Sequence, residues 1–306
     1  MFRDTILWPK PGAYILAISG GADSMVLLDV FAAAAKTRAY RLTIAHFDHG
    51  LRADSDEDRA FVETAASRLG LPYISHTAKL GIASEASART ARHAWLELIR
   101  IESGASAILT AHHQDDLLET SLLNLARGSG RLGLAPMQMT STIARPLIHV
   151  TRSQLRDYAA AHSVGWREDP TNADISNARN LLRHRILPYA SHYWRTSYFE
   201  LITELAALNT KIDQTISTIL SAHSTDEQTY SFSSEFIANR TPAELQEIIL
   251  AAARSLRPGI QLDGALIGQA VDLMRRGYKG QQKPLRLGIV LYLERGAARL
   301  TTKGSL

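Results

Sequence analysis

The stretch AYILAISGGADS, Ala13 to Ser24, decides the fold of this chain because an apolar run in it stops abruptly at two glycines. Tyr14 to Ile18 are β-prone and uninterrupted, as in a central strand that is buried on both faces. The apolar residues of the following MVLLDVFAAAA recur at helical spacing, so a helix begins within a few residues. Such a turn presents hydroxyls and backbone N–H groups at the positive end of a helix, which suits a phosphate group.

An ordinary strand-to-helix turn is the alternative, with two glycines for tightness and Asp23 or Ser24 as a cap. Asp23 is unexpected in a pure anion site, but it makes sense where a cation such as Mg²⁺ bridges carboxylate and phosphate. The sequence contains no Walker motif, and its G-x-G-x-x-G match, Gly128 to Gly133, follows a helix rather than a strand. The turn alone leaves both interpretations open.

The composition is that of an ordinary globular protein. With 306 residues, 45% hydrophobic and 21% charged, we expect about two domains. The absence of cysteine excludes disulfides, thiolate metal sites and persulfide chemistry. We expect a cytoplasmic protein without a membrane partner, because MFRDTILWPKPG has no signal-peptide pattern and no apolar run could span a bilayer. Residues 240–306 carry eleven Lys and Arg against five Asp and Glu, which suits either nucleic acid or a solvated basic face.

Strand-like runs alternate with helical patterns in the first part of the chain. Strands are expected at 14–18, 41–46, 72–76, 106–111 and 144–150, with helices between them. This order predicts an α/β fold, in which a parallel five-stranded sheet carries helices on both faces. The polar clusters SGGADS, HFDHGLR and TAHHQDD follow three of these strands. They should therefore meet in one crevice beyond the carboxyl ends of the sheet.

The pattern becomes mainly helical beyond about residue 190. Helices are expected at 199–220, 239–258 and 263–276, and a hairpin around Glu294, Arg295 and Gly296. We therefore place an α/β domain at 1–192 and a smaller, basic, mainly helical domain with a C-terminal hairpin at 193–306. WREDPTNADISNARN, Trp166 to Asn180, lacks apolar periodicity and is expected to be a loop.

Several charged pairs share a helix face. Asp116 and Glu119 lie three apart near a helix N-terminus, where they could hold a metal or an ammonium group, or simply complement the helix dipole. We interpret them as an amine site. Arg89 and Arg92 suit a phosphate or a polyanion, or are solvated helix charges. The basic and aromatic stretch at 179–195 suits single-stranded RNA or packs a domain junction.

Two other functions remain open on the residues alone. A two-metal phosphohydrolase would use His46, Asp48, His49, His112, His113, Asp115, Asp116 and Glu119, since His and carboxylates bind divalent metals. That hypothesis leaves SGGADS without a role. A noncatalytic tRNA-binding module is the second alternative, and the intact SGGADS argues against it.

Six blocks occur in order across residues 19–188: SGGADS, HFDHGLR, EASARTARH, TAHHQDDLLETSLLNLARGSGRLGL, ARPL and EDPTNADISNARNLLRHRILP. Together they resemble the motifs of the tRNA(Ile)-lysidine synthase family, one branch of the ATP pyrophosphatases that adenylate their substrates. The chain departs from the family pattern at His93, where Tyr is usual, and at Leu117, where Gln is frequent. The remainder of the chain looks like the helical domain and terminal hairpin of the short forms.

The resemblance implies an adenine nucleotide alpha-hydrolase-like fold and a ligase that forms a carbon–nitrogen bond. Its substrates would be ATP, L-lysine and tRNA(Ile) with anticodon CAU. The wobble cytidine would be adenylated with loss of pyrophosphate, and lysine would then displace AMP to form lysidine. A homodimer is one assembly open to such an enzyme.

The resemblance also implies roles for individual residues. ATP would contact Ser19, Gly20, Gly21, Ala22, Asp23, Ser24, His46, Asp48, His49, Arg52, His112 and Asp115, with Asp23 on Mg²⁺. The catalytic set would be Asp23, Arg89, Arg92, Asp116 and Glu119, of which Asp116 and Glu119 bind the lysine ammonium and the arginines compensate phosphate charge or hold RNA. The tRNA would contact Arg179, Arg183, Arg185 and Arg195.

Overall fold

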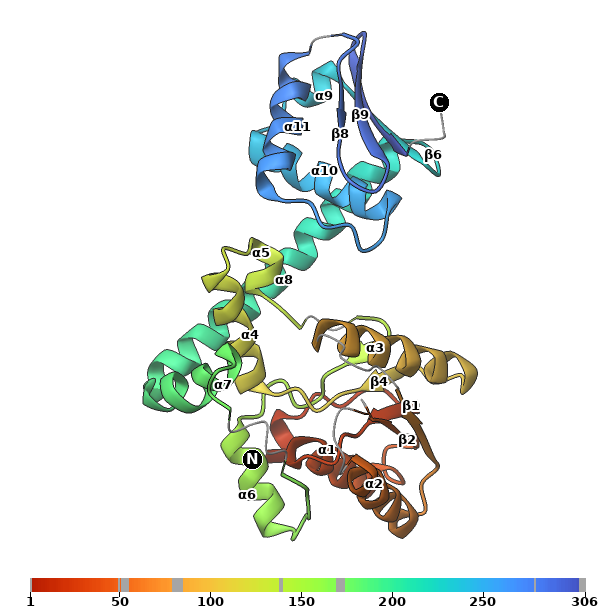
Figure 1. The fold of residues 1–306 in the computed structure, drawn as a ribbon, viewed down its shortest axis with the longest axis vertical. Helices are drawn as coiled ribbons and strands as arrows, with labels where there is room; N and C mark the ends of the chain where they lie inside the picture. Colours follow the sequence, from red (N-terminus) through yellow and green to blue (C-terminus); the bar gives the residue numbers. More distant parts are fainter. Residues whose placement is uncertain are drawn as a thin grey trace. The chain divides into compact units, whose positions relative to one another are not determined.

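The computed structural model describes residues 2–48, 50, 55–78, 85–137, 140–168, 174–277 and 279–302. Its first unit, Met1–Ala206, is built around a parallel sheet with the strand order β3-β2-β1-β4-β5. Figure 1 labels β1, β2 and β4 of this sheet. The strands are β1 (Gly12–Ala17), β2 (Tyr40–Asp48), β3 (Tyr73–Thr77), β4 (Ala107–Leu109) and β5 (Ile143–Ala144). The helical elements are η1 (Phe2–Thr5), α1 (Ala22–Ala34), α2 (Ser55–Leu69), α3 (Glu85–Glu102), α4 (Gln114–Ala126), α5 (Arg131–Leu134), α6 (Arg152–Ala161), α7 (Ala178–Leu181), η3 (Leu182–Ile186), η4 (Leu187–Tyr189) and the start of α8 (His192–His223).

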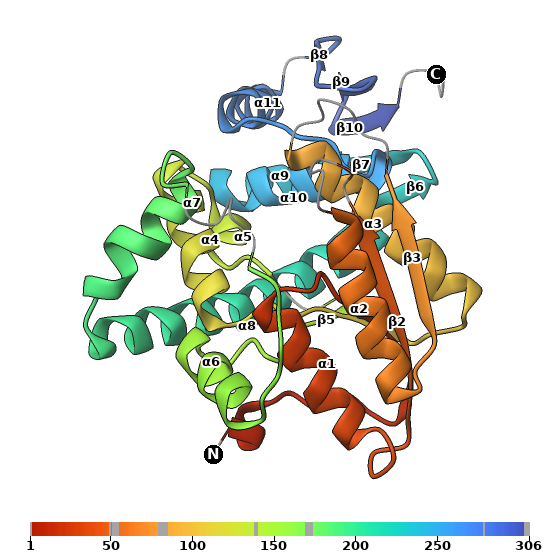
Figure 2. The same cartoon turned by 60° about the horizontal axis from the view of Figure 1, so that its bottom comes forward.

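Alternating side chains of β1 explain why this segment forms the central strand. Tyr14 and Leu16 are buried in the cluster on one face of the sheet, whereas Ile15 is buried in the cluster on the other face. Helices α1, α2 and α6 contribute to the first cluster and α3 contributes to the second. Figure 2 shows α2 beside β2 and β3. The predicted parallel sheet with helices on both faces is thus confirmed.

The strand order places the first turn where the order of the sheet reverses. β1 pairs with β2 on one side and with β4 on the other, and all of these pairs are parallel. Ligands of such sheets bind outside the carboxyl ends at that reversal. Residues 18–21 leave the end of β1 and residues 110–113 leave the end of β4. The topology therefore places the expected crevice between these two connections.

Two local differences from the expected pattern bear on the site. The strand expected at 144–150 is reduced to β5, and residues 146–149 form a turn. Pro146 has no backbone N–H group, so it cannot continue the ladder of hydrogen bonds. The loop expected at 166–180 gives way to α7, whose N-cap Asn177 accepts the backbone N–H of Arg179 at 2.8 Å.

The chain divides later than the boundary expected at 192/193. Helix α8 already starts at His192, and the division between the two compact units falls between Ala206 and Ala207, inside that helix. Ile202 of α8 is buried in a cluster with Leu117 of α4. The first part of α8 therefore belongs to the core of the first unit, and it includes much of the basic and aromatic stretch.

The second unit, Ala207–Leu306, combines helices with an antiparallel sheet of order β6-β7-β10-β9-β8. Its strands are β6 (Ser224–Asp226), β7 (Thr229–Ser233), β8 (Gln282–Pro284), β9 (Ile289–Glu294) and β10 (Ala297–Thr302), and its helices are α9 (Ser234–Ala238), α10 (Pro242–Leu256) and α11 (Gly264–Arg276). The predicted hairpin is β9 and β10. The other three strands were not expected, because they are too short and polar for their alternation to be recognised. None of the described helices combines the length and apolar character that a membrane span requires.

Candidate active site

The hydroxyl of Ser24 closes the turn between β1 and α1. It accepts the backbone N–H groups of Ser19 and Gly20, both at 3.2 Å, and donates to the carbonyl of Gly21 at 2.8 Å. Gly20 has a φ of +94°, a conformation that residues with a side chain rarely adopt. The N-cap position, Gly21, provides no side-chain hydrogen bond. The first turn of α1 therefore presents uncapped N–H donors, as helix N-termini that bind phosphate do.

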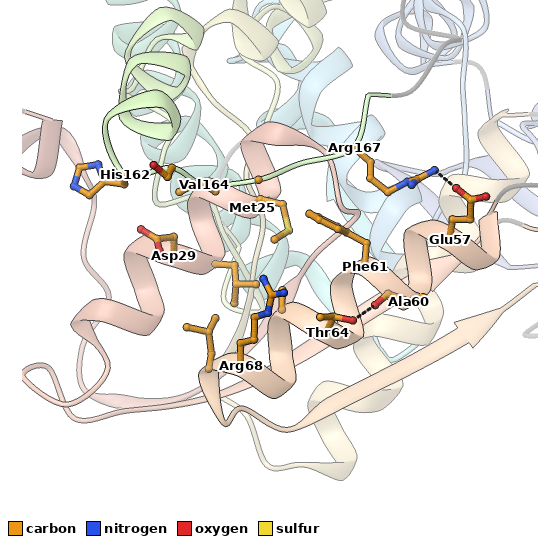
Figure 3. A pocket seen from close by; sticks show the side chains of 15 residues that line it. Met25, Asp29, Glu57, Ala60, Phe61, Thr64, Arg68, His162, Val164 and Arg167 are labelled. Atoms are coloured by element: carbon orange, nitrogen blue, oxygen red, sulfur yellow. Dashed lines mark hydrogen bonds and ion pairs between the residues drawn. The ribbon is translucent and has the colours of Figure 1, made fainter.

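A neighbouring segment holds this turn in place. The backbone N–H of Arg167 donates to the carbonyl of Gly20 at 3.0 Å, and its guanidinium pairs with Glu57 at 2.8 Å and with Asp58, both on α2. A cavity of about 610 Å³ lies alongside, between α1, α2 and residues 162–167 (Figure 3). No predicted site residue in the described part of the chain lines that cavity. It is a separate feature beside the turn.

The end of β2 brings two of the predicted residues to the same edge. His46 is buried, and its Nδ1 lies 2.9 Å from the carbonyl oxygen of Ile18 at the end of β1. Burial lowers the pKa of His46, so its ring is neutral at physiological pH. Asp48 accepts the backbone N–H of Gly50 at 2.8 Å through Oδ1. The predicted contacts of His49 and Arg52 lie outside the described residues.

His113 joins the phosphate turn to the acidic pair. Its side chain is fully buried, and Nε2 lies 3.4 Å from Oδ2 of Asp23 on α1 and 3.5 Å from Oδ2 of Asp116 on α4. Burial opposes the charged form of the ring, but the carboxylates of Asp116 and Asp23 outweigh it and raise the pKa of His113. Asp23 and Asp116, which the sequence assigned to separate tasks, therefore share one buried imidazole whose pKa both of them raise.

Two arginines hold Asp116 and Glu119 in this structure. Arg179 places Nη2 2.9 Å from Oδ1 of Asp116 and Nε 2.8 Å from Oε2 of Glu119. Arg183 places Nε 2.8 Å from Oε1 of Glu119 and reaches Asp116 at 3.3 Å. The arginines lie four residues apart on α7 and the π-helical turn η3, so both can face α4. A third arginine, Arg152 of α6, lies 3.7 Å from Glu119.

Asp115 points to a junction of helices. One carboxylate oxygen accepts the backbone N–H of Arg152, the first residue of α6, at 2.8 Å. The other oxygen pairs with the guanidinium of Arg195 on α8. Both oxygens are therefore engaged within the protein, and we infer a structural role in place of the expected nucleotide contact.

Of the four arginines expected to contact tRNA, Arg185 alone is exposed.

The basic residues Arg89 and Arg92 lie in the first half of α3. Nδ1 of His112 and the hydroxyl of Thr110 share a hydrogen bond of 2.8 Å, in which the tautomer of the ring decides the donor. Burial lowers the pKa of His112 to about 3, and the nearby charges of Arg145 and Arg92 act in the same direction. The carboxylate of Asp116 opposes this shift. His112 is therefore neutral and experiences the opposing charges of Asp116 and of Arg145 and Arg92.

The alternative two-metal site includes His49, which lies outside the described residues. Among the residues that the structure describes, no group of three or more His, Asp and Glu is arranged to hold a metal ion. Asp116 and Glu119 face guanidinium groups instead. These acids therefore have nitrogen cations of the protein itself as partners, and the amine site stays a prediction.

Sequence reasoning did not identify the bridging role of His113 or the contacts of Arg152. Both depend on side chains that approach from other elements, and no local spacing encodes them. The sequence did contain a weak signal for the ion pairs between the arginines and the acids. Arg179 and Arg183 are spaced to share one helix face, as Asp116 and Glu119 are. Matching the charges of the two faces could have suggested the pairing.

The sheet, the turn and the crevice together define a class of protein. A family model described as a PP-loop domain matches residues 4–190, which is more than half of the chain. The solved structure of U34-tRNA thiolase NcsA from Methanococcus maripaludis, with its [4Fe-4S] cluster, is similar with a TM-score of 0.55. It is 15% identical and the match covers 67% of this chain and 77% of that one, so the likeness concerns the fold alone. The fold and the site are those of a PP-loop protein.

Curated relatives identify the family to which the chain belongs within the class of PP-loop proteins. The tRNA(Ile)-lysidine synthase of Thermus thermophilus is 40% identical over 195 residues, which is 61% of this chain and 38% of that protein. The tRNA(Ile)-lysidine synthase of Chlorobaculum tepidum is 36% identical over 226 residues, 69% of this chain and 68% of that protein. The chain belongs to the tRNA(Ile)-lysidine synthase family, as its six sequence blocks suggest. It spans less than half the length of the Thermus relative.

Proposed function

We propose that this protein uses ATP to ligate L-lysine to C2 of the wobble cytidine of tRNA(Ile) with anticodon CAU. The observation that supports this most is the position of His113 between Asp23, beside the phosphate turn, and Asp116, in the acidic pair. A ligase of this kind must hold a nucleotide and an amine within one crevice. The names of its relatives, tRNA(Ile)-lysidine synthases, support the tRNA substrate.

The first turn of α1 fits the phosphates of ATP together with Mg²⁺. Its backbone N–H groups are uncapped, and Oδ1 of Asp23 is buried without a hydrogen-bond partner among the described residues. A buried carboxylate oxygen that lacks a donor suits a cation, and Mg²⁺ prefers carboxylate and phosphate oxygens. In our proposal Asp23 holds Mg²⁺, which neutralises phosphate charge when it is bound. Residues 19–24 hold the triphosphate.

The chemistry requires no nucleophile from the protein. The C2 carbonyl of cytosine is a poor electrophile, so its oxygen first attacks the α-phosphorus of ATP, and pyrophosphate leaves. The lysine amine then attacks C2, the bond from C2 to the adenylate oxygen breaks, AMP leaves, and the amine loses its proton. The chain contains no cysteine, which agrees with a route that has no covalent enzyme intermediate. The residues position the substrates and balance charge.

Lysine must replace a guanidinium group to reach the acidic pair. We expect Arg179 to give way, because its side chain is 30% exposed whereas that of Arg183 is 16% exposed. Arg183 also donates three hydrogen bonds to the two acids, whereas Arg179 donates two, so Arg183 is held more firmly. An ammonium group in place of Arg179 would keep both carboxylates paired. The exchange would then leave no buried charge without a partner.

The test is turnover of ATP to AMP and pyrophosphate with unmodified CAU tRNA, with and without lysine. We expect sustained turnover only when both are present, and lysidine in the digested tRNA. Asp23→Ala should lower the rate by about 100-fold or more, because it removes charge stabilisation at the phosphates. Hydrolysis of phosphoesters without lysine would favour the two-metal alternative. RNA binding without any consumption of ATP would favour the noncatalytic module.

A further inference from the structure

The peptide unit between Gly20 and Gly21, in the turn from β1 to α1, has no side chain on either side of it. Gly20 has a φ of +94°, which glycine adopts readily. Glycines rotate about their backbone bonds with little steric hindrance, so a peptide unit between two of them can turn over. A contact from outside the turn is therefore needed to keep this unit in one orientation.

That contact comes from residues 165–168. The backbone N–H of Arg167 donates to the carbonyl oxygen of Gly20 at 3.0 Å. A trans peptide unit points its carbonyl and its N–H in opposite directions, so this hydrogen bond turns the N–H of Gly21 away from residues 165–168. None of the residues that the structure describes accepts the N–H of Gly21. This donor is therefore available to a ligand.

The side chain of Arg167 attaches residues 165–168 to α2. Its Nη2 lies 2.8 Å from Oε2 of Glu57, as Figure 3 shows, and its Nε pairs with Asp58. Phe61 of the same helix packs beside the turn, since a Cβ on Gly20 would lie 4.0 Å from Cδ1 of its ring. Helix α2 therefore contacts both partners of the hydrogen bond between Arg167 and Gly20.

The neighbours of Arg167 attach the same residues to α6. The indole Nε1 of Trp166 donates to Oε1 of Glu168 at 2.8 Å, and Nη1 of Arg156 lies 3.0 Å from the same carboxylate oxygen. The guanidinium of Arg156 also lies 5.0 Å from the centre of the Trp166 ring. Residues 166–168 thus have attachments to two helices, and the hydrogen bond to Gly20 is formed by the residue in the middle.

We propose that Arg167 is a positioning residue for the binding of ATP, because it keeps the N–H of Gly21 directed at a phosphate oxygen. The inference rests on the proposed function for the identity of the nucleotide. Without its attachment to α2, Arg167 no longer holds the carbonyl of Gly20, and the peptide unit also adopts the reversed orientation. The carbonyl oxygen then faces the phosphates and repels them. The apparent affinity falls with the fraction of molecules whose turn is competent to bind.

The experiment measures the affinity of the full chain for ATP with Mg²⁺ by titration calorimetry, with adenosine as a second probe that lacks phosphates. Arg167→Ala should weaken ATP binding about tenfold, which corresponds to a competent fraction of about one tenth. Arg167→Lys should weaken it less than about threefold, because the ammonium group keeps one ion pair with α2. Adenosine affinity should be unchanged in both variants. The matched control is Arg100→Ala, which removes a two-pronged pair with Glu97 and should leave ATP affinity unchanged.

A second variant separates position from charge. Asp58→Ala also removes an attachment of Arg167, but it takes away a negative charge, so electrostatics alone would strengthen ATP binding. The positioning role predicts weaker ATP binding, as for Arg167→Ala. The double variant should bind ATP no more weakly than either single variant, because both changes disrupt the same contact.

Three results would overturn the inference. They are an unchanged ATP affinity in folded Arg167→Ala, tighter ATP binding by Asp58→Ala, and an equal loss of affinity for ATP and adenosine, which would indicate a general loosening of the crevice. Should Arg167→Ala fail to fold, Asp58→Ala and Arg167→Lys decide. Failure of the ligase proposal would differ, as wild-type protein would bind ATP and form no lysidine from CAU tRNA and lysine.

Discussion

Arg183 forms a two-pronged ion pair with Glu119, in which Nε lies 2.8 Å from Oε1 and Nη2 lies 2.8 Å from Oε2. The side chain of Glu119 has no exposed surface, so its carboxylate depends on such partners to remain charged inside the protein. Two of the arginines that the sequence associated with RNA, Arg179 and Arg183, are therefore engaged with the acids of the candidate site.

This ion pair should be important for stability. Arg183→Ala leaves Glu119 buried with weaker pairing, and we expect the free energy of unfolding to fall by about 3 kcal/mol in urea at neutral pH. The double variant Arg183→Leu with Glu119→Leu should lose less, because no unpaired charge remains. Arg185→Ala, at an exposed position, should change stability by less than about 0.5 kcal/mol. A loss for Arg183→Ala as small as that of Arg185→Ala would contradict the interpretation.

The acidic pair should also give a defined pH dependence. Burial alone would raise the pKa of Asp116, but His113 and Arg179 lower it from 3.8 to about 2. A depressed pKa stabilises the fold above pH 3.8, and this contribution disappears as the pH falls towards 2. The difference in unfolding free energy between wild type and Asp116→Asn should therefore shrink as the pH falls from about 4 towards 2. Asp116 also raises the pKa of His113, so the titration of His113 adds a separate change of this difference at higher pH. Urea unfolding at several pH values measures it, and a difference that persists at pH 3 without change would refute it.

Asp115 should behave as a structural residue. Asp115→Ala removes the acceptor for the first N–H group of α6 and the partner of Arg195, which should cost about 1 to 2 kcal/mol of stability. ATP affinity should stay near the wild-type value, in contrast to Asp23→Ala. Thermal unfolding and a nucleotide-binding titration separate the two effects. A selective loss of ATP binding in a fully stable Asp115→Ala would restore the nucleotide role.

Gly50, within HFDHGLR, should tolerate no side chain. A Cβ at this position would lie 2.6 Å from the backbone oxygen of Ala78, and φ is +63°. Gly70 has nearly the same φ, +64°, but a Cβ there would meet nothing within 4 Å. Both alanine variants carry the conformational cost of about 1 kcal/mol, and Gly50→Ala should lose at least about 1 kcal/mol more through the clash. Equal unfolding free energies for the two variants would argue against that close approach.

Local patterns in the sequence determined the parallel sheet and its first turn. The apolar residues of β1 require cover on both faces, and the two glycines that follow can adopt the turn that leads into α1. The spacing of Asp116 and Glu119 placed both acids on one face of α4. These features follow from backbone conformation and side-chain periodicity over a few residues, so they can be predicted without coordinates.

Only the tertiary structure decided which charges meet. Glu119 is bound by Arg179, 60 residues further along the chain, and Asp115 is bound by Arg195, 80 residues further along. Asp23 and Asp116 come together at His113 because β1 and β4 are neighbours in the sheet. Ion pairs depend on distance in space and on burial, and neither is encoded by the spacing of residues along the sequence.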